Sequence, residues 1–316
     1  MTRKELIEQL RARGIEKIWG RGLSTRTKAE LLEYLAHIEA GTTIRHLSYS
    51  QLIDFQICGL RYYFKRVDPN APKFPASGRM MFGKAYDYGV SVGLEDKQQT
   101  GNDPPVDLML DAFKQAWDNP DQDVDWTGED KSWLEAQGIE LVALYRDGLI
   151  PDIIPLAVQD EFSITFSNRD YQLMVIPDLE AELSKEVHII DHKTGMTAPG
   201  EYEAEVSEQL TCYALAYQVK TGELPDKVAI HKAVALRKAP RSTLPRYKTI
   251  KETDQGFIGI STIESKRTPD RIKRYLKTME ITIRLIQEGI FPPARSGAWP
   301  CTPEACEYWQ YCHTNF

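Results

Sequence analysis

The chain has 316 residues, 42% of them hydrophobic and 27% charged, which is enough for a buried core in one large domain, or in one domain plus a small appendage. It has no apolar run of about 18 residues, which excludes a membrane span, and its charged start lacks the apolar centre of a signal peptide, so a cytoplasmic protein is expected. The net charge of −7 argues against a surface coated in nucleic-acid-binding charge, and five cysteines in a chain of this length do not indicate a disulfide framework.

Residues 1–43 are expected to form a separate unit of two short helices. Leu6 and Leu10 recur at helical spacing in the first helix, and Leu31 and Leu35 do so in the second. Basic side chains surround both, and the half "GLSTRTKAELLEYL" resembles the SAP and helix-extended-helix family of DNA-binding modules. A two-helix module that docks another protein is the alternative.

Residues 44–316 have the pattern of a mixed α/β domain. Helices are predicted, in chain order, over 47–66, 78–94, 106–117, 130–147, 203–221 and 269–288. Strands are predicted within 157–167, 171–183, 187–195 and 227–236. Strands interleaved with helices favour a central sheet flanked by helices.

Charge is segregated along this domain. Residues 87–135 hold thirteen Asp/Glu against three Lys/Arg, a net of −10. Residues 228–275 hold twelve Lys/Arg against four Asp/Glu, a net of +8. A basic segment can bind phosphate even on an acidic protein, and Tyr247, Phe257 and Tyr275 within it could stack on bases. The alternatives are a pair of solvated faces and aromatic side chains that pack in the core.

The stretch "VHIIDHKTGM" places charged side chains at the end of an apolar strand. Asp191 and Lys193 are two residues apart, so they project from the same face of the strand. Asp178, in "MVIPDLEAEL", ends a neighbouring strand with a second isolated carboxylate. Two carboxylates and a lysine from adjacent strands can form an oxygen-rich site for Mg²⁺ or Mn²⁺. Mutual pairing at the rim of the sheet is the alternative, and a rim position is also the interpretation for Glu161.

These residues resemble the PD-(D/E)XK nuclease superfamily, in its RecB-like branch. "PDLEAELSKEVHIIDHKTG" is similar to the central motif of that family, and "EQLTCYALAY" to its Gln-x3-Tyr helix, through Gln209 and Tyr213. The upstream Gly-x3-His element is matched in part by "FGKAYDYG", where Gly83 is present and Asp87 replaces the usual histidine. The resemblance implies a restriction-endonuclease-like core, with a mixed central sheet flanked by helices.

The resemblance also implies roles for these residues. Metal would be bound by Asp87, Asp178 and Asp191, together with the backbone carbonyl of His192. Lys193 would position or activate the attacking water. Gln209 and Tyr213 would support the site and the DNA strand.

Four of the cysteines resemble a ligand set found in several RecB-like nucleases. Three of them crowd the last sixteen residues, and one precedes the nuclease motifs: Cys301, Cys306, Cys312 and Cys58. The resemblance implies a 4Fe–4S cluster, and zinc is the alternative for four thiolates. Cys212, on an apolar helix, is interpreted as a small buried residue.

The function that these patterns imply is a metal-dependent DNA exonuclease in recombination, repair or phage DNA processing. A structure-specific endonuclease and a catalytically inactive DNA-binding adaptor in recombination or packaging are the alternatives. The chain has no Gly-x4-Gly-Lys-Ser/Thr loop, so any helicase activity would come from a partner protein.

Overall fold

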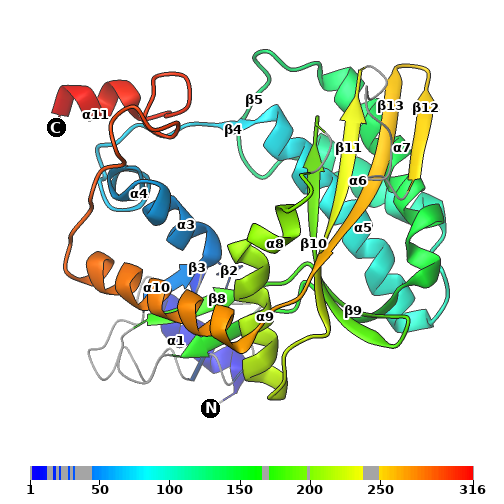
Figure 1. Cartoon of the computed structure of the whole chain (residues 1–316), viewed down its shortest axis with the longest axis horizontal. Coiled ribbons are helices and arrows are strands. Elements are labelled where there is room, and N and C mark those ends of the chain that lie inside the picture. Colours follow the sequence, from blue (N-terminus) through cyan, green and yellow to red (C-terminus); the bar gives the residue numbers. More distant parts are fainter. Residues whose placement is uncertain are drawn as a thin grey trace.

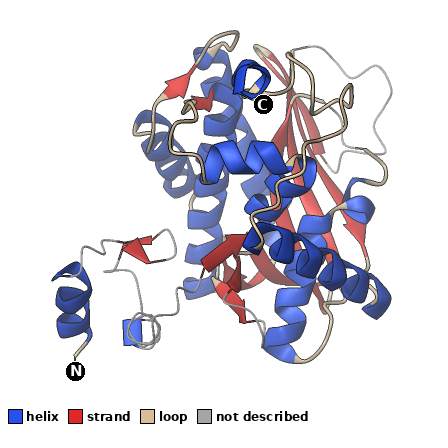
Figure 2. Cartoon of the chain, turned by 90° about the vertical axis from the view of Figure 1, so that its left-hand side faces the viewer, coloured by secondary structure: helices blue, strands red, loops and turns tan. Residues whose placement is uncertain are grey.

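The computed structural model describes residues 2–12, 17–18, 21–22, 28, 31–32, 45–165, 171–197, 200–237 and 249–315. It begins with helix α1 (Arg3–Ala12), followed by the short strands β1 (Lys17–Ile18) and β2 (Arg21–Gly22). Leu6, Leu10 and Leu31 are fully buried, as expected for apolar helix faces. Most of the predicted second helix lies outside the described residues, and the division into 1–43 and 44–316 stays a prediction. Figure 2 shows α1 beside the main body, not within it.

The main body is built on a six-stranded mixed sheet (Figure 1) with the order β12-β13-β11-β10-β9-β6. Only β10 and β11 are parallel, and the other neighbouring pairs are antiparallel. The strands are β6 (Ile154–Val158), β9 (Leu179–Leu183), β10 (Glu186–Gly195), β11 (Lys227–Leu236), β12 (Thr249–Thr253) and β13 (Gly256–Ser265). This arrangement confirms the predicted mixed α/β fold and is consistent with a restriction-endonuclease-like core.

Each face of the sheet is covered by its own hydrophobic cluster. On one face, Ile190 and Ala229 pack with the helices α5 (Gly78–Thr100), α6 (Val106–Asp118) and α7 (Lys131–Gly148). On the other, Ile189 and Val228 pack with α9 (Glu208–Thr221), α10 (Pro269–Gln287) and α3 (Tyr49–Ile57). A small sheet of β3 (Arg45–Ser48), β8 (Tyr171–Val175) and β7 (Phe162–Thr165) adds to this second layer.

The single helix predicted over 47–66 is two helices, α3 and α4 (Gly59–Arg66). Cys58 separates them in an extended conformation, with φ −162° and ψ 115°. The break brings residue 59 against the C-terminal segment, where its N–H donates to the carbonyl of Pro292. A Cβ on Gly59 would meet that oxygen at 2.6 Å, so the contact requires glycine.

Three further parts of the chain differ from the predicted elements. The run 171–183 is not one strand but β8 and β9, which belong to different sheets, with Asp178 in the turn between them. Ser207 separates α8 (Glu203–Val206) from α9, where one helix was predicted. The hairpin of β12 and β13 was not predicted.

The remaining short elements are β4 (Ala76–Ser77), β5 (Val124–Asp125), a 3₁₀ turn (Ile150–Asp152) and α11 (Trp309–Asn315). No helix in the described part of the chain is long and apolar enough to span a membrane.

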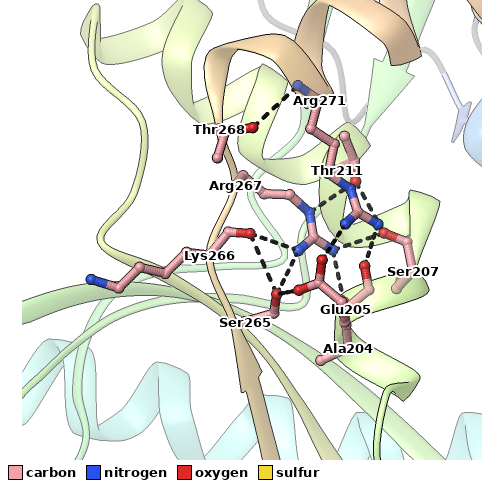
Figure 3. A network of polar contacts seen from close by, with 9 residues as sticks. All are labelled: Ala204, Glu205, Ser207, Thr211, Ser265, Lys266, Arg267, Thr268 and Arg271. Atoms are coloured by element: carbon pink, nitrogen blue, oxygen red, sulfur yellow. Dashed lines mark hydrogen bonds and ion pairs between the residues drawn. The ribbon is translucent and has the colours of Figure 1, made fainter.

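A buried arginine joins the end of β13 to α8 and α9 (Figure 3). Arg267 is 5% exposed, and its guanidinium donates to Thr211 and to the carbonyls of Ala204 and Ser207 at 2.8–2.9 Å. It also donates to Ser265. Burial, followed by the charge of a neighbouring arginine, lowers the pKa of Arg267 to about 10, so it remains a cation at neutral pH. The network fixes the first turn of α9.

We expect Arg267→Met to lower the free energy of unfolding by about 3 kcal/mol, because buried carbonyls on α8 and α9 would lose their donor. Chemical denaturation would measure the change. Arg284→Met on α10 is the matched control, since Arg284 is 63% exposed and forms a surface ion pair with Glu288. That substitution should change stability by less than about 1 kcal/mol. Equal losses in both variants would contradict a structural role for the network.

Candidate active site

Strand β10 directs its polar residues to both faces of the sheet, because side chains alternate along a strand. Asp191 and Lys193 share a face with Ile189, which packs in the layer of α9 and α10. His192 shares the other face with Ile190, which packs in the layer of α5 and α7. The predicted site therefore spans the two layers at this point of β10.

Asp191 has one paired and one unpaired carboxylate oxygen. The residue is 1% exposed, and its Oδ1 accepts a hydrogen bond of 2.8 Å from the ammonium of Lys193. Its Oδ2 is buried and has no hydrogen-bond partner among the described residues. A buried carboxylate oxygen without a donor is costly, and a bound cation would satisfy it.

Asp87 and Asp178 meet the ring of His192 beside this carboxylate. Oδ2 of Asp178 accepts from the backbone N–H of His192 at 2.7 Å, and Oδ1 of Asp87 lies 3.1 Å from Nδ1 of the ring. One ligand atom from each of the three residues lies within 4.8 Å of the others. The family resemblance implied only the backbone carbonyl of His192 as a metal ligand, and this geometry makes its imidazole a further candidate ligand.

Gln159 and Gly83 help to position Asp87, Asp178 and the end of β10. Gln159 donates from its side chain to Oδ2 of Asp87 at 2.8 Å and from its backbone to the carbonyl of Asp178 at 3.1 Å. It does so in the left-handed region, with φ 46°, an uncommon conformation for a residue other than glycine. A Cβ on Gly83 would lie 3.1 Å from the hydroxyl of Thr194, so the glycine lets α5 approach the end of β10 closely.

Gln209 and Tyr213 lie on one face of α9, as their spacing predicts. The amide of Gln209 donates to the hydroxyl of Tyr213 at 2.7 Å. Burial and then the negative charges of Asp178 and Asp191 raise the pKa of Tyr213 well above its ordinary value. The phenol is therefore neutral at physiological pH and lies within the electrostatic reach of the carboxylates.

Comparison with known families decides the assignment. The sequence model described as "PD-(D/E)XK nuclease superfamily" matches residues 46–313. The chain belongs to the PD-(D/E)XK nuclease superfamily. The match covers every site residue described above, from Asp87 to Tyr213.

Other comparisons add little to this assignment. The chain is similar to the protein described as "Crystal structure of SSO0001", with 13% sequence identity and a TM-score of 0.30. The match covers 75% of this nuclease-family chain and 84% of the other chain. No curated protein matches the chain significantly.

The carboxylates of this nuclease-family site repel one another. Burial, followed by the charges of Asp191 and Asp87, raises the pKa of Asp178 from its ordinary 3.8 to about 7. Burial also raises the pKa of Asp191, and the nearby ammonium of Lys193 only partly opposes this. Like charges gathered in a buried site favour either protons or a cation, so the donor set fits a divalent metal.

Lys193 remains an ammonium. Burial lowers its pKa, but the charge of Asp191 and the hydrogen bond to it prevail, and the net shift is upward. Its side chain is 41% exposed, so the positive charge can reach a ligand from solvent. A protonated lysine stabilises and orients negative charge but does not abstract a proton.

Several residues around the candidate metal ligands belong to none of the motifs recognised in the sequence. The hydroxyl of Tyr145 on α7 hydrogen bonds to both His192 and His231, the latter on β11. The side-chain amide of Gln159 donates to Asp87 and to the hydroxyl of Ser91. One signal was present in the sequence, because a histidine within the apolar run "KVAIHKAVAL" is unusual for a buried strand. Glu161 lies between β6 and β7, and its assignment to the rim stays a prediction.

The described cysteines do not form a metal-ligand group. Cys212 is fully buried, and burial raises its pKa to about 12. Burial, followed by the charges of Cys58, Cys306 and Cys301, raises the pKa of Cys312. These four thiols do not meet at the mutual distances of the group around Asp87, within the residues that the structure describes.

Four of the eight described lysines and arginines in the basic segment are in ion pairs. Lys232 pairs with Glu203 on α8, and Lys251 pairs with Glu140 on α7. Tyr275 is 5% exposed and packs in the core, so the simpler interpretation of that aromatic holds. Residues 238–248, which include Tyr247 and several basic residues, lie outside the described residues.

Proposed function

We propose that this protein is a Mg²⁺- or Mn²⁺-dependent deoxyribonuclease that hydrolyses phosphodiester bonds with water, without a covalent intermediate. One observation supports it most strongly. Asp87, Asp178 and His192 offer ligand atoms within 4.8 Å of one another, beside a buried Asp191 oxygen that has no hydrogen-bond donor among the described residues.

The residues of the site would divide the work. Asp87, Asp178, Asp191 and His192 would hold the cation, which supplies charge neutralisation and an acidified water. The ammonium of Lys193 would stabilise negative charge on the phosphate and orient the incoming water, since it stays protonated. Gln209 and Tyr213 would support the carboxylates and the DNA strand from α9.

DNA is the proposed substrate, and attack from ends is the proposed mode. The exonuclease proposal is supported by the four-cysteine arrangement, which resembles that of end-processing relatives. A role in recombination, repair or phage DNA processing, with any helicase activity from a partner protein, remains part of this proposal. The N-terminal residues 1–43 would add a docking module for DNA or protein.

Activity on linear and circular DNA would test the proposal. Anaerobically purified protein would be incubated with end-labelled single-stranded and duplex DNA and with a closed circle, in Mg²⁺, Mn²⁺ or EDTA. Metal-dependent shortening of linear DNA with an intact circle supports an exonuclease, and a nicked circle indicates an endonuclease. DNA binding without cleavage in any metal would overturn the catalytic proposal in favour of an adaptor.

We also propose that Cys58, Cys301, Cys306 and Cys312 hold a 4Fe–4S cluster, with zinc as the alternative. The backbone N–H of Ala294 donates to the Cys58 thiol at 3.3 Å, so the segment that leads to the last three cysteines contacts Cys58, which supports this proposal. Metal, iron and sulfide analysis of the anaerobic protein would identify the group. We expect Cys306→Ser to lose it while Cys212→Ser retains it, and equal retention in both would contradict the assignment.

A further inference from the structure

The candidate ligand His192 belongs to a hydrogen-bonded chain of three buried side chains, together with Tyr145 and His231. The hydroxyl of Tyr145 lies 3.1 Å from Nε2 of His192 and 2.9 Å from Nδ1 of His231. The two histidines are paired directly across β10 and β11, and their ring centroids are 6.1 Å apart with planes at 29°. All three residues are at most 7% exposed, so bulk water has little access to these contacts.

The chain has two possible directions, because a hydroxyl has one proton. Tyr145 can donate to only one of the two rings and must accept from the other. If it donates to His192, the Nδ1 of that ring carries the proton and donates to Asp87. If it donates to His231, then Nε2 of His192 carries the proton, and Nδ1 of a neutral ring presents a lone pair.

The second direction places two lone pairs opposite each other, an arrangement that would favour a bound cation. The Nδ1 lone pair of His192 would then face Oδ1 of Asp87 at 3.1 Å, an arrangement that is repulsive for the pair alone. A divalent cation bound by both atoms removes the repulsion. A carboxylate oxygen of Asp178 lies within 4.8 Å of one ligand atom of each of these two residues.

We propose that Tyr145 and His231 are positioning residues that prepare Nδ1 of His192 as a nitrogen ligand of the active-site cation. This inference rests on the proposed function. Histidine ligands usually donate their other ring N–H to a fixed acceptor, which sets the tautomer and the ring orientation. Tyr145 is that acceptor, and Nδ1 of His231 accepts the hydrogen bond that the Tyr145 hydroxyl donates, so that the hydroxyl oxygen presents a lone pair to the N–H of His192.

A nitrogen ligand would favour binding of Mn²⁺ over Mg²⁺ at this site. Imidazole nitrogen suits Mn²⁺ better than Mg²⁺, which favours oxygen ligands and retained waters. Loss of the hydrogen-bond partner that orients a metal ligand typically lowers metal affinity by about 10- to 100-fold. Tyr145→Phe should therefore weaken Mn²⁺ binding by about that factor and Mg²⁺ binding by less.

Pulsed electron paramagnetic resonance of Mn²⁺ bound to the full-length protein would test the nitrogen ligand without needing catalysis. We expect a directly coordinated ¹⁴N in the wild type. His192→Asn places an oxygen near the position of Nδ1, so it should retain Mn²⁺ but lose the nitrogen coupling. Mn²⁺ and Mg²⁺ affinities would be measured in parallel by calorimetry.

Matched variants separate positioning from packing. Tyr86→Phe removes another buried hydroxyl, one with no hydrogen-bond partner among the described residues, so it should leave Mn²⁺ affinity unchanged. His231→Asn keeps an acceptor for Tyr145 and should retain affinity, whereas His231→Leu should behave like Tyr145→Phe.

Two results would overturn the inference. Bound Mn²⁺ without nitrogen coupling in the wild type would exclude the imidazole ligand while leaving a carboxylate nuclease site intact. Equal affinity in Tyr145→Phe and Tyr86→Phe would exclude the positioning role. Absence of cleavage together with an intact nitrogen coupling would instead contradict the proposed function and leave this inference standing.

Discussion

Asp191→Asn should lower metal-dependent DNA cleavage by at least about 10³-fold, because it removes a proposed charged ligand of the cation, which would contribute several kcal/mol to the stabilisation of the transition state. The same change should raise the stability of the metal-free protein. Burial disfavours the ionised Asp191 more than Lys193 favours it, as the raised pKa shows, and a neutral amide removes that penalty. Loss of activity with a gain in stability is typical of a functional site.

Cleavage rates on end-labelled DNA and thermal unfolding in EDTA would measure the two effects, with DNA binding as a check that the fold is retained. Asp226→Asn is the matched control, because this exposed carboxylate accepts from the backbone N–H of Val187 near the other end of β10. It should leave cleavage unchanged. A fully active Asp191→Asn would contradict the assigned role of Asp191, and a metal-free variant less stable than the wild type would contradict the electrostatic argument.

The metal-free protein should lose stability as the pH rises from about 4 to about 7, in contrast to proteins whose carboxylates are paired. The folded state holds the Asp178 proton with a pKa of about 7, whereas the unfolded chain releases it near 3.8. The folded state therefore binds more protons over this range, so the slope of unfolding free energy against pH is negative. The difference corresponds to at most about 4 kcal/mol. The raised pKa of His192, where burial opposes the shift and Asp87 causes it, acts in the same direction.

Chemical denaturation in EDTA across this pH range would measure the slope. Asp178→Asn should flatten it, because the amide does not titrate. Saturating Mn²⁺ or Mg²⁺ at pH 8 should restore stability, since the cation binds the folded state in place of the protons. A wild-type curve that rises with pH in EDTA would contradict the buried-carboxylate arrangement.

Local sequence determined the parts of this protein that depend on short-range geometry. Strand alternation alone places Asp191 and Lys193 on one face of β10, and helical spacing alone places Gln209 beside Tyr213. The interleaving of predicted strands with predicted helices was enough to predict the mixed α/β fold. Periodicity could not distinguish one long helix from two around Cys58, because the break depends on a contact with Pro292, more than 200 residues away.

Only the tertiary structure decided what surrounds the motif carboxylates. Gln159 reaches Asp87 and Asp178 through a left-handed backbone conformation, which no residue type in that stretch signals. Tyr145 and His231 meet His192 because β11 pairs in parallel with β10 while α7 crosses that face of the sheet. The sequence by itself specified which residues carry the charges, since strand and helix periods are local. Which atoms face one another is set by long-range packing and strand register, and these have no local code.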